Sequence, residues 1–125
     1  MEDSVFTKII KGEIPCYKIY EDDKTIAFLD IAPEVAGHTL VVPKVQVDKF
    51  YELSDEDYTA VMATVKKLAV HMEKVLERRP IVKIIGVDVP HAHVHVMPYS
   101  AEWKDGVALE PTEAEMQEIC DKLAF

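Results

Sequence analysis

Histidine alternates three times with apolar residues in residues 91–96, whose sequence is HAHVHV. Successive side chains of an extended strand point to opposite faces, so His91, His93 and His95 are expected on one face, about 6.6 Å apart from one to the next. The alanine and valines between them face the other way. A row of imidazoles backed by apolar side chains is typical of a site that holds a phosphate-sized anion.

Two kinds of chemistry suit this row of imidazoles. Neutral imidazole is a common zinc ligand, so the strand could supply two ligands of a metal centre, with His38 as a third. Alternatively, one imidazole attacks phosphorus while its neighbours orient it and hold the phosphate oxygens. A purely structural role is disfavoured, because three alternating histidines rarely arise by chance. The spacing alone does not separate metal chemistry from covalent chemistry.

The order of the elements that must position these histidines is mostly strands with one long helix inserted. This order predicts an α+β domain built on an antiparallel β-sheet, with one long helix and short terminal helices. Runs of apolar and alternating residues, bounded by proline, glycine and acidic turns, predict the strands. The predicted strands span residues 16–21, 25–30, 38–43, 81–87 and 91–98.

The long helix is predicted over residues 55–79. Ser54 is a natural N-cap, and apolar side chains recur three and four residues apart in one continuous stripe, which indicates packing against the core. His71 lies off that stripe and is expected to be solvated and without function. Shorter helices are predicted over 6–11, ending at Gly12, and over 112–123, which opens with a capping box.

Length and charge narrow the class of protein. A chain of 125 residues fits one domain, with a core over about residues 5–99 and a tail that carries the last helix. The formal net charge of −9 argues against nucleic acid polymers as partners, although a pocket can still take a mononucleotide. No apolar run suits a membrane span or a signal peptide. Cys16 and Cys120 form no CxxC pair, which indicates free thiols in a reducing compartment, so we predict a cytoplasmic protein.

The histidine run resembles the signature of the histidine triad (HIT) family, His-x-His-x-His with apolar residues between. The likeness extends beyond the run, in family order: Phe6 to Pro15, then 21–23 with 28–31 as the first hairpin, then Gly37 to Lys44, and Gly86 to Pro98 around the signature itself. The likeness covers most of residues 5–99 and is greatest to the bacterial and Hint-like branch. It implies a HIT-like fold and a hydrolase or transferase that cleaves a nucleoside phosphoramidate or a related nucleotidyl compound.

The resemblance also implies roles for single residues. His93 matches the nucleophile that forms a covalent nucleotidyl-histidine intermediate, and His95 matches the residue that hydrogen-bonds the phosphate and the leaving-group side. His91 matches the residue that orients and polarises the nucleophile, and His38 lines the phosphate site. Asp30 matches the carboxylate that grips the ribose hydroxyls, although a turn residue is the alternative. The apolar positions around the base are Phe6, Ile9, Phe28, Ile31 and Leu40, of which Phe6 and Ile9 could equally serve core packing.

One departure from the family concerns metal. Many bacterial members hold zinc with an N-terminal CxxC, a later histidine and the first triad histidine. Here Ser4, Thr7 and Gln46 stand at three of those positions, and hydroxyl and amide oxygens are poor zinc ligands. We therefore expect no structural zinc and no cofactor.

A second departure concerns the loop before the triad, which is shortened and lacks the family's phosphate-binding Asn. Val87 replaces a Gln, and Asp88 stands where Ser, Thr or Glu is usual. An ionised Asp88 would repel a phosphate, whereas a protonated one could donate a proton to the leaving group. We place Asp88 among the nucleotide-binding residues.

The expected partners are a purine mononucleotide or nucleotidyl substrate and, on resemblance, a second copy of the chain in a homodimer. Two alternatives to the histidine-nucleophile enzyme stay open. One is a non-catalytic purine-nucleotide sensor or scaffold, reached through loss of the loop. The other is a zinc-dependent hydrolase that uses His38, His93 and His95.

Overall fold

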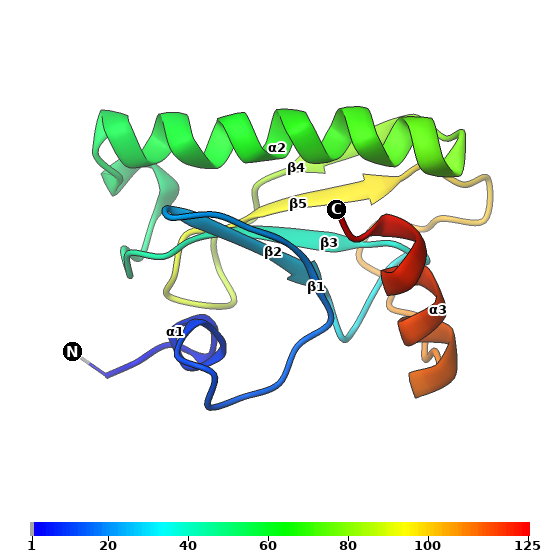
Figure 1. The fold of residues 1–125 in the computed structure, drawn as a ribbon, viewed down its shortest axis with the longest axis horizontal. Coiled ribbons are helices and arrows are strands. Elements are labelled where there is room, and N and C mark those ends of the chain that lie inside the picture. The colour runs from blue at the N-terminus through cyan, green and yellow to red at the C-terminus, as the bar shows by residue number, and fades with distance from the viewer. Residues whose placement is uncertain (1) are drawn as a thin grey trace.

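Five antiparallel strands form one sheet in the order β1-β2-β3-β5-β4, in a computed structural model that describes residues 2–125 (Figure 1). The strands are β1 (Lys18–Glu21), β2 (Thr25–Leu29), β3 (Thr39–Pro43), β4 (Pro80–Lys83) and β5 (Val94–Pro98). Every residue of β2, β3 and β5 is buried, as expected for central strands covered on both faces. The predicted α+β fold on an antiparallel sheet is therefore confirmed.

Helices cover both faces of the sheet (Figure 1). The long helix α2 (Asp55–Leu76) lies across one face, and the short helix α1 (Val5–Ile10) lies on the opposite side. The third helix, α3 (Glu113–Leu123), packs near β1 and adds its apolar side chains to the core on the α2 side. None of the helices in residues 2–125 has the length and apolar character to cross a membrane.

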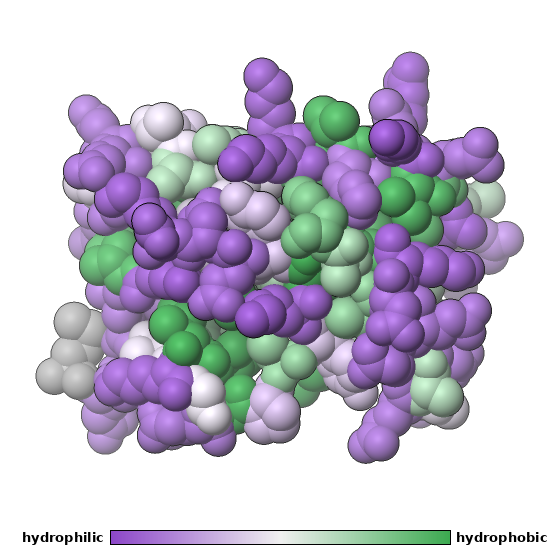
Figure 2. Space-filling view, viewed as in Figure 1, coloured by the Kyte–Doolittle hydropathy of each residue, from purple (hydrophilic) through white to green (hydrophobic). Residues whose placement is uncertain are grey.

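The strand alternation divides the core into two clusters. Ala27 and Leu29 of β2 point toward α2, whereas Ile26 and Phe28 of the same strand pack with Phe6 of α1. Figure 2 shows apolar surface in the lower part of the same view, where α1 lies, with hydrophilic residues around it. The α1 side of the sheet is thus the thinner layer, which leaves room there for a site.

The helix ends follow from local capping. Ser54 caps α2 by accepting from the Asp57 N–H, and Thr112 with Glu115 forms the predicted capping box of α3. The prediction that the long helix reaches residue 79 is wrong, because Glu77 adopts a left-handed conformation (φ 56°) and ends the helix at Leu76.

Three strand predictions extend too far by two residues or more. The first is residues 16–21, since β1 begins only at Lys18. β4 stops at Lys83 rather than residue 87, and β5 begins at Val94 rather than residue 91. The intervening chain turns at Gly86 (φ 73°), and the Ala92 N–H bonds to the carbonyl of Val47 instead of a sheet neighbour. His91 and His93 therefore precede the strand that carries His95.

The expectation that His71 is solvated is also wrong. Its ring is partly buried and stacks on Phe125, with 4.2 Å between ring centroids. Phe125 in turn stacks on Tyr20, and its N–H bonds to the carbonyl of Ile19 in β1. The end of the chain is thereby packed against an edge of the sheet.

Candidate active site

A cavity of about 470 Å³ opens on the α1 side of the sheet. It is lined by α1, by the loops that follow α1 and β2, by the segment before β5 and by residues of the tail. Nine of the residues predicted for the site line it: Phe6, Ile9, Phe28, Asp30, Ile31, Leu40, Asp88, His93 and His95. His38 and His91 do not line the cavity but contact residues that do.

The backbone fixes which nitrogen of the neutral His93 ring carries the proton. Its Nδ1 lies 2.7 Å from the carbonyl oxygen of His91, and a carbonyl only accepts, so the Nδ1–H donates. The Nε2 of the neutral ring is then unprotonated and carries the lone pair that a nucleophile needs. The edge-to-face contact with Phe6, 5.0 Å between centroids, fixes the ring plane.

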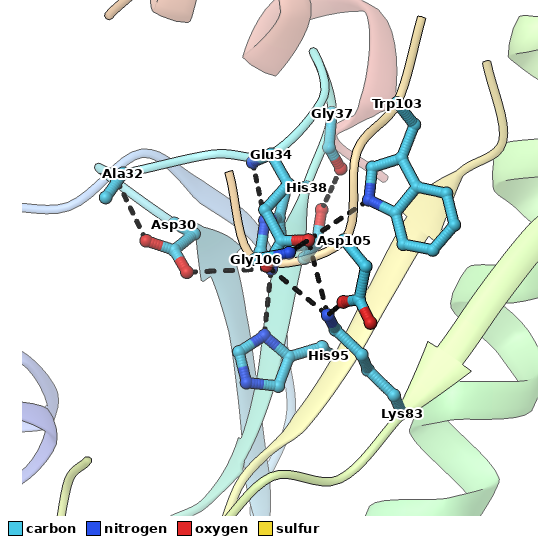
Figure 3. A network of polar contacts seen from close by, with 11 residues as sticks. Asp30, Ala32, Glu34, Gly37, His38, Lys83, His95, Trp103, Asp105 and Gly106 are labelled. Carbon is cyan, nitrogen blue, oxygen red and sulfur yellow. Dashed lines mark hydrogen bonds and ion pairs between the residues drawn. The ribbon is translucent and has the colours of Figure 1, made fainter. Parts of the chain in front are cut away.

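His38 and His95 form a chain of ordered hydrogen bonds (Figure 3). The Glu34 N–H donates to His38 Nδ1 at 3.0 Å, so the His38 proton is on Nε2. His38 Nε2 lies 2.8 Å from His95 Nδ1, and its N–H donates to that nitrogen. The remaining proton of His95 is consequently on Nε2.

His95 Nε2 is buried and has no hydrogen-bond partner among residues 2–125. A buried donor without a partner costs about 1–3 kcal/mol, so a group that accepts from it would be stabilised there. Burial also lowers the pKa of His95 to about 4, with smaller contributions from His38 and His93. Near neutral pH this ring is therefore an uncharged donor at the cavity wall.

Asp30 directly follows β2 and is partly buried at the cavity. Its Oδ1 accepts from the Ala32 N–H at 2.9 Å, and its Oδ2 lies 3.5 Å from His38 Nε2. The first of these contacts is the turn expected of an aspartate at a strand end, and the residue also lines the cavity. Burial raises the pKa of Asp30, which strengthens its tendency to take hydrogen-bond donors.

His91 occupies a different place from the one predicted. Its ring is fully buried, its Nε2–H donates to the carbonyl of Pro43 at 2.8 Å, and its Nδ1 accepts from the Ser4 hydroxyl at 2.7 Å. Only its backbone carbonyl contacts His93. Residue 91 lies before β5, which begins only at Val94, and its ring is turned toward α1. Through its two hydrogen bonds the imidazole holds the chain before β5 in place.

The four positions that the family resemblance relates to a zinc site, Ser4, Thr7, Gln46 and His91, lie together and are joined by hydrogen bonds. Besides the contact between Ser4 and His91, the Ser4 N–H and the Thr7 hydroxyl both donate to Gln46 Oε1, at 2.9 and 2.5 Å. Two hydroxyl oxygens and an amide oxygen are neutral, hard ligand atoms. The Nδ1 lone pair of His91 is already taken by the hydrogen bond from the Ser4 hydroxyl. This donor set does not fit a zinc ion.

Asp30, His38 and His95 are the group in residues 2–125 whose ligand atoms could surround a metal, all within 4.8 Å of one another. His93, a ligand in the zinc alternative, is not in this group. The 2.8 Å between His38 Nε2 and His95 Nδ1 is a hydrogen-bond distance with a proton between the two atoms. A metal at this place would have to replace that bond.

Glu34 is the main residue that sequence reasoning missed. Its carboxylate accepts from the Trp103 indole N–H, from the Gly106 N–H and from the Lys83 ammonium (Figure 3). These partners lie 49 to 72 residues away in sequence, so no local pattern marks Glu34 among the acidic residues.

Comparison with known proteins shows the family of the chain. The family model described as the HIT domain matches residues 11–102, which is most of the chain. The chain belongs to the histidine triad family. An adenosine 5'-monophosphoramidase of Schizosaccharomyces pombe is 42% identical over 96 residues, covering 75% of this chain and 72% of that protein.

Solved structures of HIT proteins share the fold. A HIT-like protein from Bartonella henselae superposes with a TM-score of 0.86 at 29% identity, covering 97% of this chain and 93% of the other. A zinc-bound HIT protein from Mycobacterium smegmatis gives 0.79 at 29% identity, covering 95% and 88%. The family thus includes a zinc-bound member.

Proposed function

We propose that this HIT protein is a nucleotidyl hydrolase that cleaves nucleoside phosphoramidates through a covalent intermediate on His93. The observation that carries the proposal is the pairing of an unprotonated Nε2 on His93 with a buried donor, the Nε2–H of His95, in one cavity. A nucleophile beside an unpartnered donor suits a reaction in which negative charge on phosphoryl oxygens must be stabilised.

The reaction proceeds in two displacements. In the first, His93 Nε2 forms a bond to phosphorus, the bond between phosphorus and the leaving nitrogen breaks, and the amine departs with a proton for which His95 Nε2–H is the assigned donor. In the second, water attacks the same phosphorus and gives a proton back to His95 Nε2, the bond to His93 breaks and the nucleoside monophosphate is released. The hydrogen bond from His93 Nδ1–H to the His91 carbonyl stabilises the cationic ring formed in the first step.

The cavity lining favours an amine over a polyphosphate as leaving group. Three carboxylates, Asp30, Glu34 and Asp88, line it, and among residues 2–125 neither lysine nor arginine does. A chain of phosphates would meet repulsion there, whereas an amine would not. We place the nucleoside among the apolar residues near Phe28 and assign the ribose hydroxyls to Asp30.

The direct test is replacement of His93 by Ala. We expect loss of turnover of adenosine 5'-phosphoramidate by at least about a thousandfold, because the nucleophile is gone, with AMP affinity retained. His71→Ala, which removes a histidine away from the cavity, is the matched control and should leave kcat unchanged. Undiminished turnover by the His93 variant would refute the proposal.

A nucleotide sensor without catalysis is the second candidate, and the position of Asp88 favours it. Asp88 is exposed and lines the cavity, so its charge opposes a phosphorylated substrate. A sensor would bind AMP and never form an adduct. Asp88→Asn separates the two, because an enzyme should gain a few-fold in kcat/KM when this repulsion is removed, whereas a sensor should gain only affinity.

We also propose that the chain is one domain and works as a cytoplasmic homodimer. Within residues 2–125, β4 pairs with β5 along one edge only, which leaves its outer edge open for a second sheet. Val82 of this strand is 45% exposed. Cys16 and Cys120 are free thiols, which fits a reducing compartment.

A further inference from the structure

A segment of the tail lines part of the cavity and is held there from several sides. Residues 100–110, named here the strap, contribute Gly106 and Ala108 to the cavity wall. Residues 103–110 lie beyond the part of the chain that the family model matches. The strap is therefore a feature of this chain whose role the family assignment does not supply.

Glu34 is the anchor of the strap. A single oxygen, Oε1, accepts from Trp103 Nε1–H at 3.0 Å and from the Gly106 N–H at 2.9 Å. The side chain of Glu34 is 10% exposed, so these bonds are largely shielded from water. Burial alone would raise the pKa of Glu34, but the bonds from Gly106, Trp103 and Lys83 outweigh it and lower the pKa.

Lys83, the last residue of β4, connects Glu34 to the part of the sheet that carries His95. Its ammonium lies 3.3 Å from Glu34 Oε1 and 2.5 Å from Asp105 Oδ1 of the strap, and it lies over the Trp103 ring (Figure 3). In the sheet, Lys83 of β4 is the direct cross-strand partner of His95. The strap is thus fixed on the side of the site where His95 lies.

Glu34 links the strap to the histidines in a second way. Its backbone N–H fixes the proton position on His38, and through it the donor on His95. Its side chain fixes the strap. Replacement of the side chain therefore leaves the backbone bond to His38 available.

We propose that the strap, anchored by Glu34, forms the wall against the substrate's leaving group and restricts the enzyme to small amines. This inference rests on the proposed function, which places the leaving group beside His95. A docked strap leaves only the space beside its small wall residues, Gly106 and Ala108. A strap released from Glu34 opens the same end of the cavity to larger groups.

Trp103 reports strap docking independently of catalysis, because it is the chain's single tryptophan. In Glu34→Ala we expect red-shifted emission and at least about twofold stronger acrylamide quenching. Glu34→Gln retains an acceptor for the indole N–H and should stay near the wild type. Glu102→Ala removes a strap carboxylate that bonds Ser100 and should not change the spectrum. Unchanged Trp103 emission in Glu34→Ala would overturn the anchor.

Leaving-group selectivity is the functional test. It compares kcat/KM for adenosine 5'-phosphoramidate with kcat/KM for the tryptamine phosphoramidate of AMP, which share the nucleotide. We expect the preference for the small amine to fall at least about fivefold in Glu34→Ala, through a gain with the bulky substrate, and to persist in Glu34→Gln and Glu102→Ala. An unchanged ratio in Glu34→Ala would overturn the role of the strap.

Failure of the two proposals can be told apart. If the wild type turns over neither substrate, the proposed function fails, and the Kd values of both compounds on the His93→Ala background still test the wall. A Kd ratio that Glu34→Ala lowers supports the strap as a wall against the leaving group. A Kd ratio that Glu34→Ala leaves unchanged contradicts it.

Discussion

At the residue scale, hydrogen bonds assign the proton of each neutral histidine of the site to one ring nitrogen, Nδ1 in His93 and Nε2 in the other three. Carbonyl oxygens fix the proton of His91 on Nε2 and that of His93 on Nδ1. The Glu34 N–H fixes His38, which fixes His95. One ring is thereby a base with a free lone pair, one is a donor, and two serve as supports. Identical side chains obtain different roles from their neighbours.

Acid stability follows from the burial of His38. Burial lowers its pKa from 6.5 to about 4, so between those values the unfolded chain binds a proton that the folded protein does not. The free energy of unfolding should therefore fall as the pH drops from 6.5 to 4, by roughly 3 kcal/mol for this group. His95 shifts in the same direction.

The measurement is urea unfolding of wild type and His38→Gln at several values between pH 7 and pH 4. The glutamine variant should show a shallower loss of stability with acidification, because one buried neutral histidine is gone. Equal pH dependence in the two proteins would show that His38 does not titrate as described.

At the element scale, α1 supports the site through its N-cap residue, Ser4. Ser4 caps the helix by accepting from the Thr7 N–H, and its hydroxyl donates to His91 Nδ1. The backbone of His91 in turn holds His93. The start of α1, a buried imidazole and the nucleophile are thus joined by consecutive contacts.

Ser4→Ala should lose both the helix cap and the donor to a buried acceptor. We expect a cost of about 2 kcal/mol in unfolding free energy and a reduction of about tenfold in kcat. Ser54→Ala is the matched control, because Ser54 caps α2 by the same contact and has no bond to the site. It should cost about 1 kcal/mol and leave kcat unchanged.

Equal losses of activity in the two serine variants, measured well below their unfolding midpoints, would contradict a specific role of Ser4. Activity is assayed with adenosine 5'-phosphoramidate, and stability is measured by urea unfolding.

At the scale of the whole molecule, the two faces of the sheet have separate tasks. The α2 side carries the larger core cluster, and the α1 side carries the cavity, the histidines and the strap. The edge at β1 is packed by α3 and Phe125, while β4 is open on its outer side in the described part of the chain.

The open edge predicts the oligomeric state. Sedimentation equilibrium at micromolar concentration should give the mass of two chains, and Val82→Glu should shift the protein toward one chain by placing a charge beside the edge. Lys8→Glu, a charge change on α1 far from this edge in the fold, is the control. A wild type that sediments as one chain would contradict the dimer.

The sequence predicts the elements whose patterns are local. The apolar run of β2 and the stripe of α2 needed only neighbouring residues, as did the caps at Ser54 and Thr112. The orientation of His91 could not be predicted, because it depends on contacts with Ser4 and Pro43, which lie 87 and 48 residues away. The anchor at Glu34 depends on the tail in the same way.

The central claim is tested most directly by mass spectrometry of protein mixed with adenosine 5'-phosphoramidate and quenched within milliseconds in alkaline denaturant, which preserves a bond between phosphorus and histidine nitrogen. We predict an added mass of one AMP, mapped by peptide fragmentation to His93 and absent from His93→Ala. Turnover by the wild type without any adduct, or an adduct on another residue, would contradict the account.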